Sequence, residues 1–196
     1  MEASQLEIMA PAGDFECLHA AIQGGADAVY FGIGRLNMRS HSANNFAAED
    51  LAEVCRICRE SGVRSYLTLN ITLYDEDLED MRQALRLAAR AGVSAVIATD
   101  MAAIMYARSL GLEVHISTQL SISNSESLRF YAQFADVVVL ARELTVEEIA
   151  HIHRQVPQVE LEVFVHGALC VSYSGLCYAS QYCFRRSANR GECAQF

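Results

Sequence analysis

Short blocks of hydrophobic residues alternate along the chain with longer segments in which apolar positions recur every three or four residues. The short blocks predict buried strands and the longer segments predict amphipathic helices. The expected strands are "LEIMAPAG", "ADAVYFGI", "RSYLTLNI", "SAVIATD", "EVHISTQ", "DVVVLARE" and "LEVFVHG". The expected helices cover residues 15–25, 47–62, 75–92, 101–110, 124–134 and 145–155.

This alternation predicts an α/β fold with a parallel sheet and crossover helices. About seven strands favour a TIM-like (β/α) barrel that is incomplete, with residues 1–167 as its body and 168–196 as a cysteine-rich, arginine-containing loop segment. An open doubly wound sheet is the alternative, but the first strand–helix turn, "APAGDFE", lacks the G-x-G-x-x-G phosphate loop. An unfinished barrel leaves an unpaired edge, from which we expect self-association.

Polar residues stand where the predicted strands end, which is where barrel enzymes place their sites. Asp100 is the residue we most expect to cap the following helix, and Asn70 and Gln119 could bind substrate or only hydrogen-bond at the rim. Arg142 and Glu143 could form a rim ion pair or belong to the catalytic site. The strand-end set is Asn70, Asp100, Gln119, Arg142, Glu143 and His166.

The last predicted strand carries two candidate site residues. Strand side chains alternate, so Glu162, Phe164 and His166 should share the face towards the barrel interior while Val163 and Val165 meet the helices. A buried carboxylate needs a partner, and Arg142 on the preceding strand is a candidate. His166 is interpreted either as a catalytic residue or as a hydrogen-bonded structural histidine.

Composition and charge narrow the function classes. The 196 residues are 52% hydrophobic, no apolar run reaches the roughly 18 residues of a membrane span, and the N-terminus does not resemble a signal peptide, so we expect a cytoplasmic protein. The chain contains no Lys, which excludes a lysine Schiff base in this sequence. The net charge is −9, but residues 167–196 carry three Arg against one Glu, a balance of +2. An anionic partner would therefore bind near Arg185, Arg186 and Arg190.

Seven cysteines in a chain expected in a reducing compartment suggest a metal or catalytic site more than disulfides. Cys55 and Cys58 lie on an apolar helix face, and we expect them and Cys17 to be core residues. The other four, Cys170, Cys177, Cys183 and Cys193, crowd into 24 residues without the usual zinc spacing. An iron–sulfur or other metal site, a Cys170–His166 nucleophile pair and unligated thiols all remain open.

One motif carries a family resemblance. Glu-x-Phe-x-His-Gly-Ala-Leu-Cys at residues 162–170, followed by Gly175-x-Cys177, matches the signature of peptidase family U32, the collagenase-like proteases. "MAPAGD", "GADAVYFG", "TLN" and "LARELTVEEI" also resemble this family, so the resemblance covers nearly the whole chain. "RSANRGEC" is most similar to the branch that hydroxylates a cytidine in 23S ribosomal RNA. Sister branches act on tRNA uridine and on ubiquinone precursors.

The resemblance implies a TIM-like barrel with a 4Fe-4S cluster on Cys170, Cys177 and Cys193. It also implies a longer chain that supplies a remaining ligand and the last strand, so we expect the present fragment to lack both cluster and activity. The implied activity is C5-hydroxylation of an RNA pyrimidine in the full-length enzyme, with His166, Glu143 and Arg142 as catalytic candidates and Asn70, Gln119 and the three arginines as substrate contacts. Proteolysis of a protein or peptide substrate is the alternative, and a non-enzymatic RNA-maturation module is a third.

Overall fold

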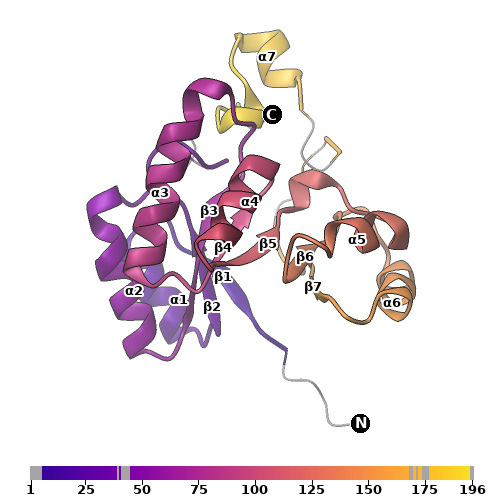
Figure 1. Ribbon diagram of the computed structural model, residues 1–196, viewed down its shortest axis with the longest axis horizontal. Coiled ribbons are helices and arrows are strands. Elements are labelled where there is room, and N and C mark those ends of the chain that lie inside the picture. The colour runs from indigo at the N-terminus through magenta and orange to yellow at the C-terminus, as the bar shows by residue number, and fades with distance from the viewer. Residues whose placement is uncertain are drawn as a thin grey trace.

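A computed structural model describes residues 6–38, 40, 45–167, 170, 172–173 and 177–194. In this part of the chain, seven parallel strands form one sheet whose spatial order is the order of the sequence. The sheet curls into an incomplete TIM-like barrel, as the alternating pattern predicts (Figure 1). The strands are β1 (Met9–Pro11), β2 (Ala28–Phe31), β3 (Arg64–Leu69), β4 (Ala95–Ala98), β5 (Glu113–Ile116), β6 (Val137–Val139) and β7 (Glu160–Glu162).

Helices connect the strands and cover the outer face of the sheet (Figure 1). They are α1 (Phe15–Gln23), α2 (Leu51–Glu60), α3 (Leu78–Ala91), α4 (Met101–Ser109), α5 (Ser125–Tyr131), α6 (Val146–Gln155) and, after β7, α7 (Ala179–Phe184). Short 3-10 turns occupy Ala48–Asp50, Asp75–Asp77, Thr118–Leu120 and Ala188–Arg190.

Local sequence signals explain where several helices begin. Asp14 accepts a hydrogen bond from the backbone N–H of Cys17, and Asp100 accepts one from Ala102, so the predicted capping role of Asp100 is confirmed. Thr145 forms a capping box with Glu148, which satisfies two backbone donors at the start of α6. These caps begin each helix directly after a strand or its loop, which keeps the crossover connections short.

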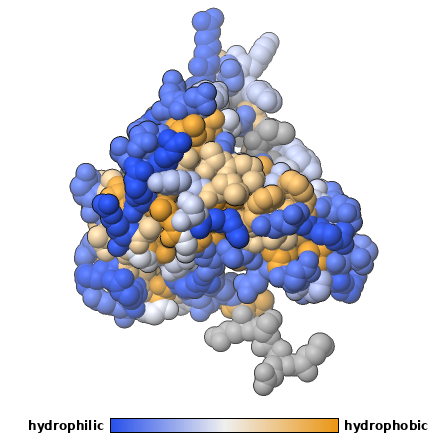
Figure 2. Space-filling model, in the orientation of Figure 1, coloured by the Kyte–Doolittle hydropathy of each residue, from blue (hydrophilic) through white to orange (hydrophobic). Residues whose placement is uncertain are grey.

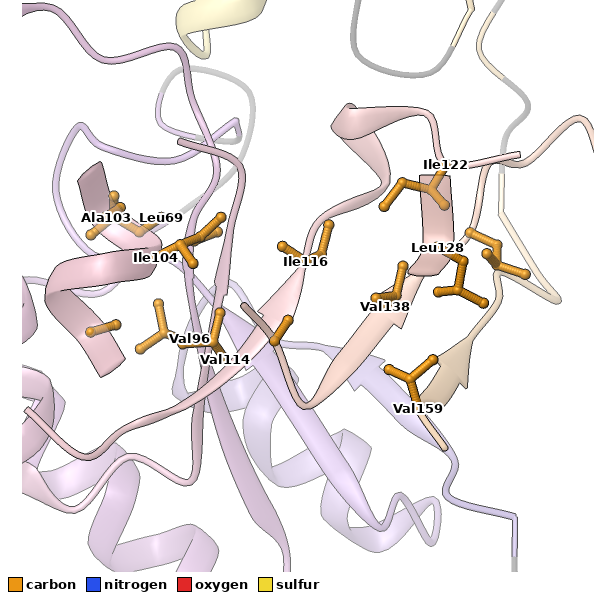
Figure 3. Close-up of a cluster of buried hydrophobic side chains, with 14 of the residues drawn as sticks. Leu69, Val96, Ala103, Ile104, Val114, Ile116, Ile122, Leu128, Val138 and Val159 are labelled. Carbon is orange, nitrogen blue, oxygen red and sulfur yellow. The ribbon is translucent and has the colours of Figure 1, made fainter. Parts of the chain in front are cut away.

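The main core lies between the outer face of the sheet and the helices. Val96 and Val114 face α4, where Ile104 is fully buried, and Val138 faces Leu128 of α5 (Figure 3). A separate, smaller cluster lies on the inner face and is built from Ala28, Tyr66, Ala95 and Ile97, with Met9 and Tyr30 packed against it. The barrel interior is therefore packed on the β1–β4 side.

The last strand is shorter than its sequence predicts. β6 offers only three residues for pairing, and β7 pairs with it over Glu160–Glu162. Val163 and Val165 are 38% and 92% exposed, so the expectation that they pack against helices is wrong. Within the described residues no eighth strand pairs with this edge. The residues after Glu162 therefore do not continue as a strand, although hydrophobic and polar residues still alternate there. Self-association through the edges at β1 and β7 remains a prediction.

The structure also shows which of the first three cysteines are buried. Cys55 and Cys58 are buried on the inner side of α2, and burial raises the pKa of both thiols, so their predicted core role is confirmed. Cys17 is exposed on α1, and its predicted core role is wrong because Leu18, the next residue, takes the buried position instead. Among the described residues, no helix is long and apolar enough to cross a membrane.

Candidate functional site at the barrel mouth

Two of the predicted substrate-binding residues meet at the C-terminal ends of the strands. The amide nitrogen of Asn70, after β3, lies 3.4 Å from Oε1 of Gln119, after β5. Oδ1 of Asn70 accepts a hydrogen bond from the backbone N–H of Met38 at 3.1 Å, and the buried Ser117 hydroxyl donates to Gln119. These contacts hold a polar rim in a fixed arrangement across β2, β3 and β5.

Arg142 and Cys170 form a second part of the mouth. Sγ of Cys170 lies 3.1 Å from the Ser172 hydroxyl, and Ser172 followed by Arg142 lowers the pKa of this thiol. Thiolate character at neutral pH therefore increases at Cys170. Glu143, the neighbouring catalytic candidate, is exposed on the turn after β6.

His166 is not among the groups that shift the pKa of Cys170. The strand ends four residues before it, and the side chain is exposed beside Gly167, whose φ of 138° breaks the extended course of the chain. Interior placement, which depended on the strand continuing, is therefore wrong for His166. Glu162 does lie inside, but its partner is His115 of β5 and not Arg142. The motif residues 168, 169 and 175 lie outside the described residues.

The motif cysteines do not form a metal-binding set in this structure. Across the described ranges there is no group of three or more His, Cys, Asp or Glu side chains arranged to hold a metal ion. Cys170 and Cys183 are exposed, while Cys177 and Cys193 are half-buried. The predicted ligands therefore do not fit a cluster as they are placed, and the 4Fe-4S group remains a prediction.

Residues 177–194, here called the cysteine module, form a small unit at the C-terminal end of the described chain. The backbone N–H of Cys177 donates to Oδ1 of Asn189 at 3.1 Å, and Ala194 donates to the buried hydroxyl of Ser180 at 2.9 Å. The backbone N–H groups of Cys177 and of Ala194, the residue after Cys193, are thus each bound to a side chain of this segment, although the sulfur atoms are not arranged to hold a metal ion.

Arg190 attaches the cysteine module to the barrel. Its guanidinium donates to Oδ2 of Asp77 at 2.7 Å and to the carbonyl of Thr72 at 2.9 Å, and it lies over the Tyr74 ring, 4.2 Å from the centroid. Asp77 is fully buried, and hydrogen bonds from Arg190 are the main cause of a strongly lowered pKa at this carboxyl. Arg190, which was expected to lie near an anionic partner, therefore pairs with a carboxylate of the acidic body.

Arg185 and Arg186 are placed differently. Both are exposed, and the Arg186 guanidinium lies 5.5 Å from the centre of the Phe184 ring. α7 and the residues beside it project from the body, in blue and pale blue in Figure 2. Three aromatic side chains beside these arginines are also exposed: Tyr178, Tyr182 and Phe184. The charge pattern does not predict them as site residues, but the four-residue spacing of the two tyrosines could have indicated a shared helix face.

A buried polar group in the barrel interior was also missed. His115 is 3% exposed in its side chain, and its Nε2 lies 2.9 Å from Oε1 of Glu113 while its Nδ1 lies 3.6 Å from Oε2 of Glu162. Burial alone lowers the pKa of His115, but the Glu162 and Glu113 carboxylates outweigh it and the pKa is raised. The alternation in "EVHIS" could have placed Glu113, His115 and Ser117 on the interior face.

Comparison with known sequences identifies the family. The profile described as Peptidase family U32 matches residues 13–196. A collagenase of Porphyromonas gingivalis is 54% identical over all of this chain and 50% of its own length. The 23S rRNA 5-hydroxycytidine synthase of Escherichia coli is 38% identical over all of this chain and 29% of its own length, and tRNA hydroxylation protein P1 of Bacillus subtilis is 38% identical over 96% and 45%.

Comparison with known structures agrees on the fold. The U32 peptidase Mk0906 superposes with a TM-score of 0.69 at 16% identity, over 83% of this chain and 70% of its own. The chain spans half or less of the curated relatives named above. Because relatives named for proteolysis and for RNA hydroxylation both match, similarity over the whole chain does not select one activity. The profile match over residues 13–196 and the identity to the P. gingivalis collagenase establish that this chain belongs to peptidase family U32.

Proposed function

We propose that the full-length protein hydroxylates C5 of a pyrimidine in RNA, either a cytidine of 23S rRNA or a uridine of tRNA. The observation that carries this proposal is the exposed surface formed by Tyr178, Tyr182 and Phe184 with Arg185 and Arg186, called here the α7 surface. Exposed aromatic rings interleaved with arginines are the groups that bind unpaired nucleotides, because bases stack on the rings and phosphates pair with the guanidinium groups.

The charge around the α7 surface supports an anionic partner. In the segment 163–191 the sequence contains no Asp or Glu, whereas the body before it is strongly acidic. Glu192, the acid that follows, accepts a hydrogen bond from the backbone N–H of Ser187 at 3.1 Å. The α7 surface is also attached through Arg190 to the loop after β3, so it is held beside the mouth where Asn70 and Gln119 meet.

Proteolysis is the second candidate, because the P. gingivalis collagenase is 54% identical to this chain. A cysteine peptidase needs a base beside its nucleophile. The groups that lower the pKa of Cys170 are Ser172 and Arg142, and neither is a general base at neutral pH. The described geometry therefore supports the RNA activity better than the peptidase activity.

Cys170, Cys177 and Cys193 are proposed as the sulfur ligands of an iron–sulfur cluster in the full-length protein. Their side chains must approach one another from the positions described above. Anaerobic purification of the full-length protein should give a brown sample with bound iron and sulfide, and Cys170→Ala should lose most of the iron. A colourless, iron-free protein after anaerobic reconstitution would contradict this assignment.

A deletion experiment separates the two enzymatic candidates. The gene is deleted in its host, nucleosides from rRNA and tRNA are compared with wild type by mass spectrometry, and the purified full-length protein is assayed on gelatin. Loss of one hydroxypyrimidine supports the proposed function. Unchanged nucleosides, together with gelatin cleavage that Cys170→Ala abolishes, would establish the peptidase instead.

Binding to the α7 surface can be measured on this chain directly. We expect Tyr182→Ala to weaken binding of a fluorescent single-stranded RNA by about tenfold, since a stacked base contributes about 1–3 kcal/mol. The double variant Arg185→Ala, Arg186→Ala should weaken binding and reduce its salt dependence. Arg129→Ala is the matched control, because Arg129 is an exposed arginine on α5 that pairs with Glu126. Equal affinity in all variants would rule out the α7 surface as the RNA contact.

A further inference from the structure

His115 is a buried histidine on the inner face of the barrel, and residues of three strands surround its ring. Its ring packs against Tyr66 of β3 with centroids 4.7 Å apart. Glu113 of its own strand and Glu162 of β7 bracket the two ring nitrogens. The imidazole orientation is therefore fixed by contacts from β3, β5 and β7.

Stability alone does not explain a histidine at this position. Ile97 and Val137, the residues in register with His115 on the neighbouring strands, are both aliphatic. A buried ionic group is commonly no more stabilising than a well-packed apolar one. In addition, Nδ1 of His115 makes no hydrogen bond in the structure, which is a costly arrangement for a buried polar atom. Such a costly polar group is a candidate for a role in function.

The two carboxylates beside His115 differ in their other partners. Glu113 lies at the start of β5, where both its oxygens are 2.7 Å from Nη2 of Arg64, so its charge is already balanced. Arg64 also contacts Glu7, which accepts a hydrogen bond from the Tyr66 hydroxyl at 2.6 Å. Glu162 makes one ion pair among the described residues, and that pair is with His115.

The position of Glu162 directs it towards the mouth. It is the last residue of β7, and the C-terminal ends of parallel barrel strands form the face that carries the site. Val137 of β6 is in register with His115 on one side and with Glu160 on the other. Glu162, two residues after Glu160, therefore lies two residues closer to the mouth than His115. Its side chain is 20% exposed against 3% for His115, which makes Glu162 the accessible member of the pair.

We propose that Glu162 is the proton-accepting carboxylate of the mouth site and that His115 is its positioning partner. In the step it performs, a bond from hydrogen to a substrate atom breaks, an O–H bond forms on Glu162, and the electron pair stays on the substrate. Nothing is oxidised or reduced in this transfer. His115 lies beside Glu162 and fixes the orientation of its carboxylate. The proposal rests on the proposed function only for the identity of the substrate.

The pair itself is tested on this chain without RNA. The ring protons of the six histidines are followed by NMR from pH 5 to 9, and the His115 signal is assigned by its loss in His115→Gln. Glu162→Gln should lower the pKa of His115, because it removes the neighbouring negative charge. Glu160→Gln, an exposed carboxylate on the same strand, is the control and should leave it unchanged. An unchanged His115 titration in Glu162→Gln would overturn the pair.

The catalytic role is tested on the full-length protein. Glu162→Gln should reduce kcat by at least about a hundredfold while RNA binding stays within a few-fold of wild type, as expected for the loss of a general base. His115→Gln should lower kcat by less than Glu162→Gln does and leave RNA binding unchanged, because it removes the partner that orients Glu162 and not the proton acceptor itself. Undiminished kcat in Glu162→Gln overturns the role. If the full-length protein cleaves gelatin and modifies no RNA, the proposed function fails. The role of Glu162 is then tested separately, by measuring whether Glu162→Gln reduces kcat for gelatin cleavage.

Discussion

The barrel body and the cysteine module are held together by different kinds of contact. In the body, aliphatic side chains of neighbouring elements, such as Leu85 and Ile104, are fully buried against one another. The cysteine module buries Ser180, Ala188 and Gly191. Its contacts with the body include the buried Asp77 carboxylate and two hydrogen bonds with the backbone of Thr72, one from the Arg190 side chain and one to the carbonyl of Asn189. Apolar burial contributes stability in proportion to area, whereas a polar attachment depends on a few exact positions. The body should therefore tolerate the loss of the module contacts, while the module should not.

The largest effect is expected in the body. Leu85→Ala on α3 removes a side chain with 0% exposure from the main cluster and should lower the free energy of unfolding by about 3–4 kcal/mol. Leu87→Ala, on the same helix at 39% exposure, is the control and should cost under about 1 kcal/mol. Urea unfolding followed by circular dichroism measures both. Similar losses in the two variants would show that the cluster is not the source of stability.

A smaller and local effect is expected when the attachment is broken. Asp77→Ala removes the acceptor of Arg190 and of Arg35, and charge-assisted hydrogen bonds contribute about 1.5–3 kcal/mol each. Trypsin should then cleave after Arg185 or Arg186 on the order of tenfold faster, while the thermal transition of the body changes little.

The control for this experiment is Asp80→Asn, because Asp80 pairs with Arg35 at the surface and does not contact Arg190. It should leave the cleavage rate unchanged. A body that unfolds as readily as the cysteine module in Asp77→Ala would contradict the difference between the two regions, since the attachment would then support the whole fold.

The difference between local apolar packing in the body and long-range polar contacts in the module also explains how much of the structure the sequence could predict. Hydrophobic periodicity and caps identify every strand and helix from β1 to α6, because each depends on residues within one element. The Asp77–Arg190 contact joins positions 113 residues apart, and no local pattern encodes it. The exposure of His166 was not predicted for a related reason: alternation continues past Glu162 in the sequence, but β6 offers a pairing partner only as far as Val139.

The candidate site was predictable in part. Asn70 and Gln119 follow strands, so parallel topology alone brings them to one rim, and the structure shows them in contact. His115 carries the same alternation signal as Glu113 and Ser117, but an imidazole inside a strand is more often structural, and only its two carboxylate neighbours mark it out. Those neighbours come from register across β5, β6 and β7, which a single sequence does not specify.

Gly191 tests how closely the cysteine module fits the body. A Cβ at this position would lie 2.3 Å from Oγ of Ser40 and 2.6 Å from the carbonyl oxygen of Asn37, and its φ is +88°. Gly191→Ala should weaken attachment by about 1–2 kcal/mol and expose the module to trypsin. Gly111→Ala has a similar φ of +74° but open space around its Cβ, so it isolates the backbone strain from the steric clash. Equal cleavage of the module in the two variants would mean that close contact at Gly191 is unimportant.

The smallest effect concerns the pH dependence of the body. The pKa of His115 is raised in the folded state, so the stability it contributes is fully present below its unfolded pKa of about 6.5 and is lost as pH rises through the folded pKa. The pKa of the neighbouring Glu113 is lowered, since His115 and Arg64 outweigh the effect of burial, and the pKa of Tyr66 is raised by burial and by Glu7, so neither of these two groups titrates in this window. Urea unfolding from pH 6 to 9 should therefore show stability falling in the wild type and a flatter profile in His115→Gln.

The control is His153→Gln, because His153 is an exposed histidine on α6, and this variant should keep the wild-type slope. A slope that survives His115→Gln would show that the interior histidine is uncharged in the folded protein, because a neutral imidazole gains nothing from the two carboxylates beside it.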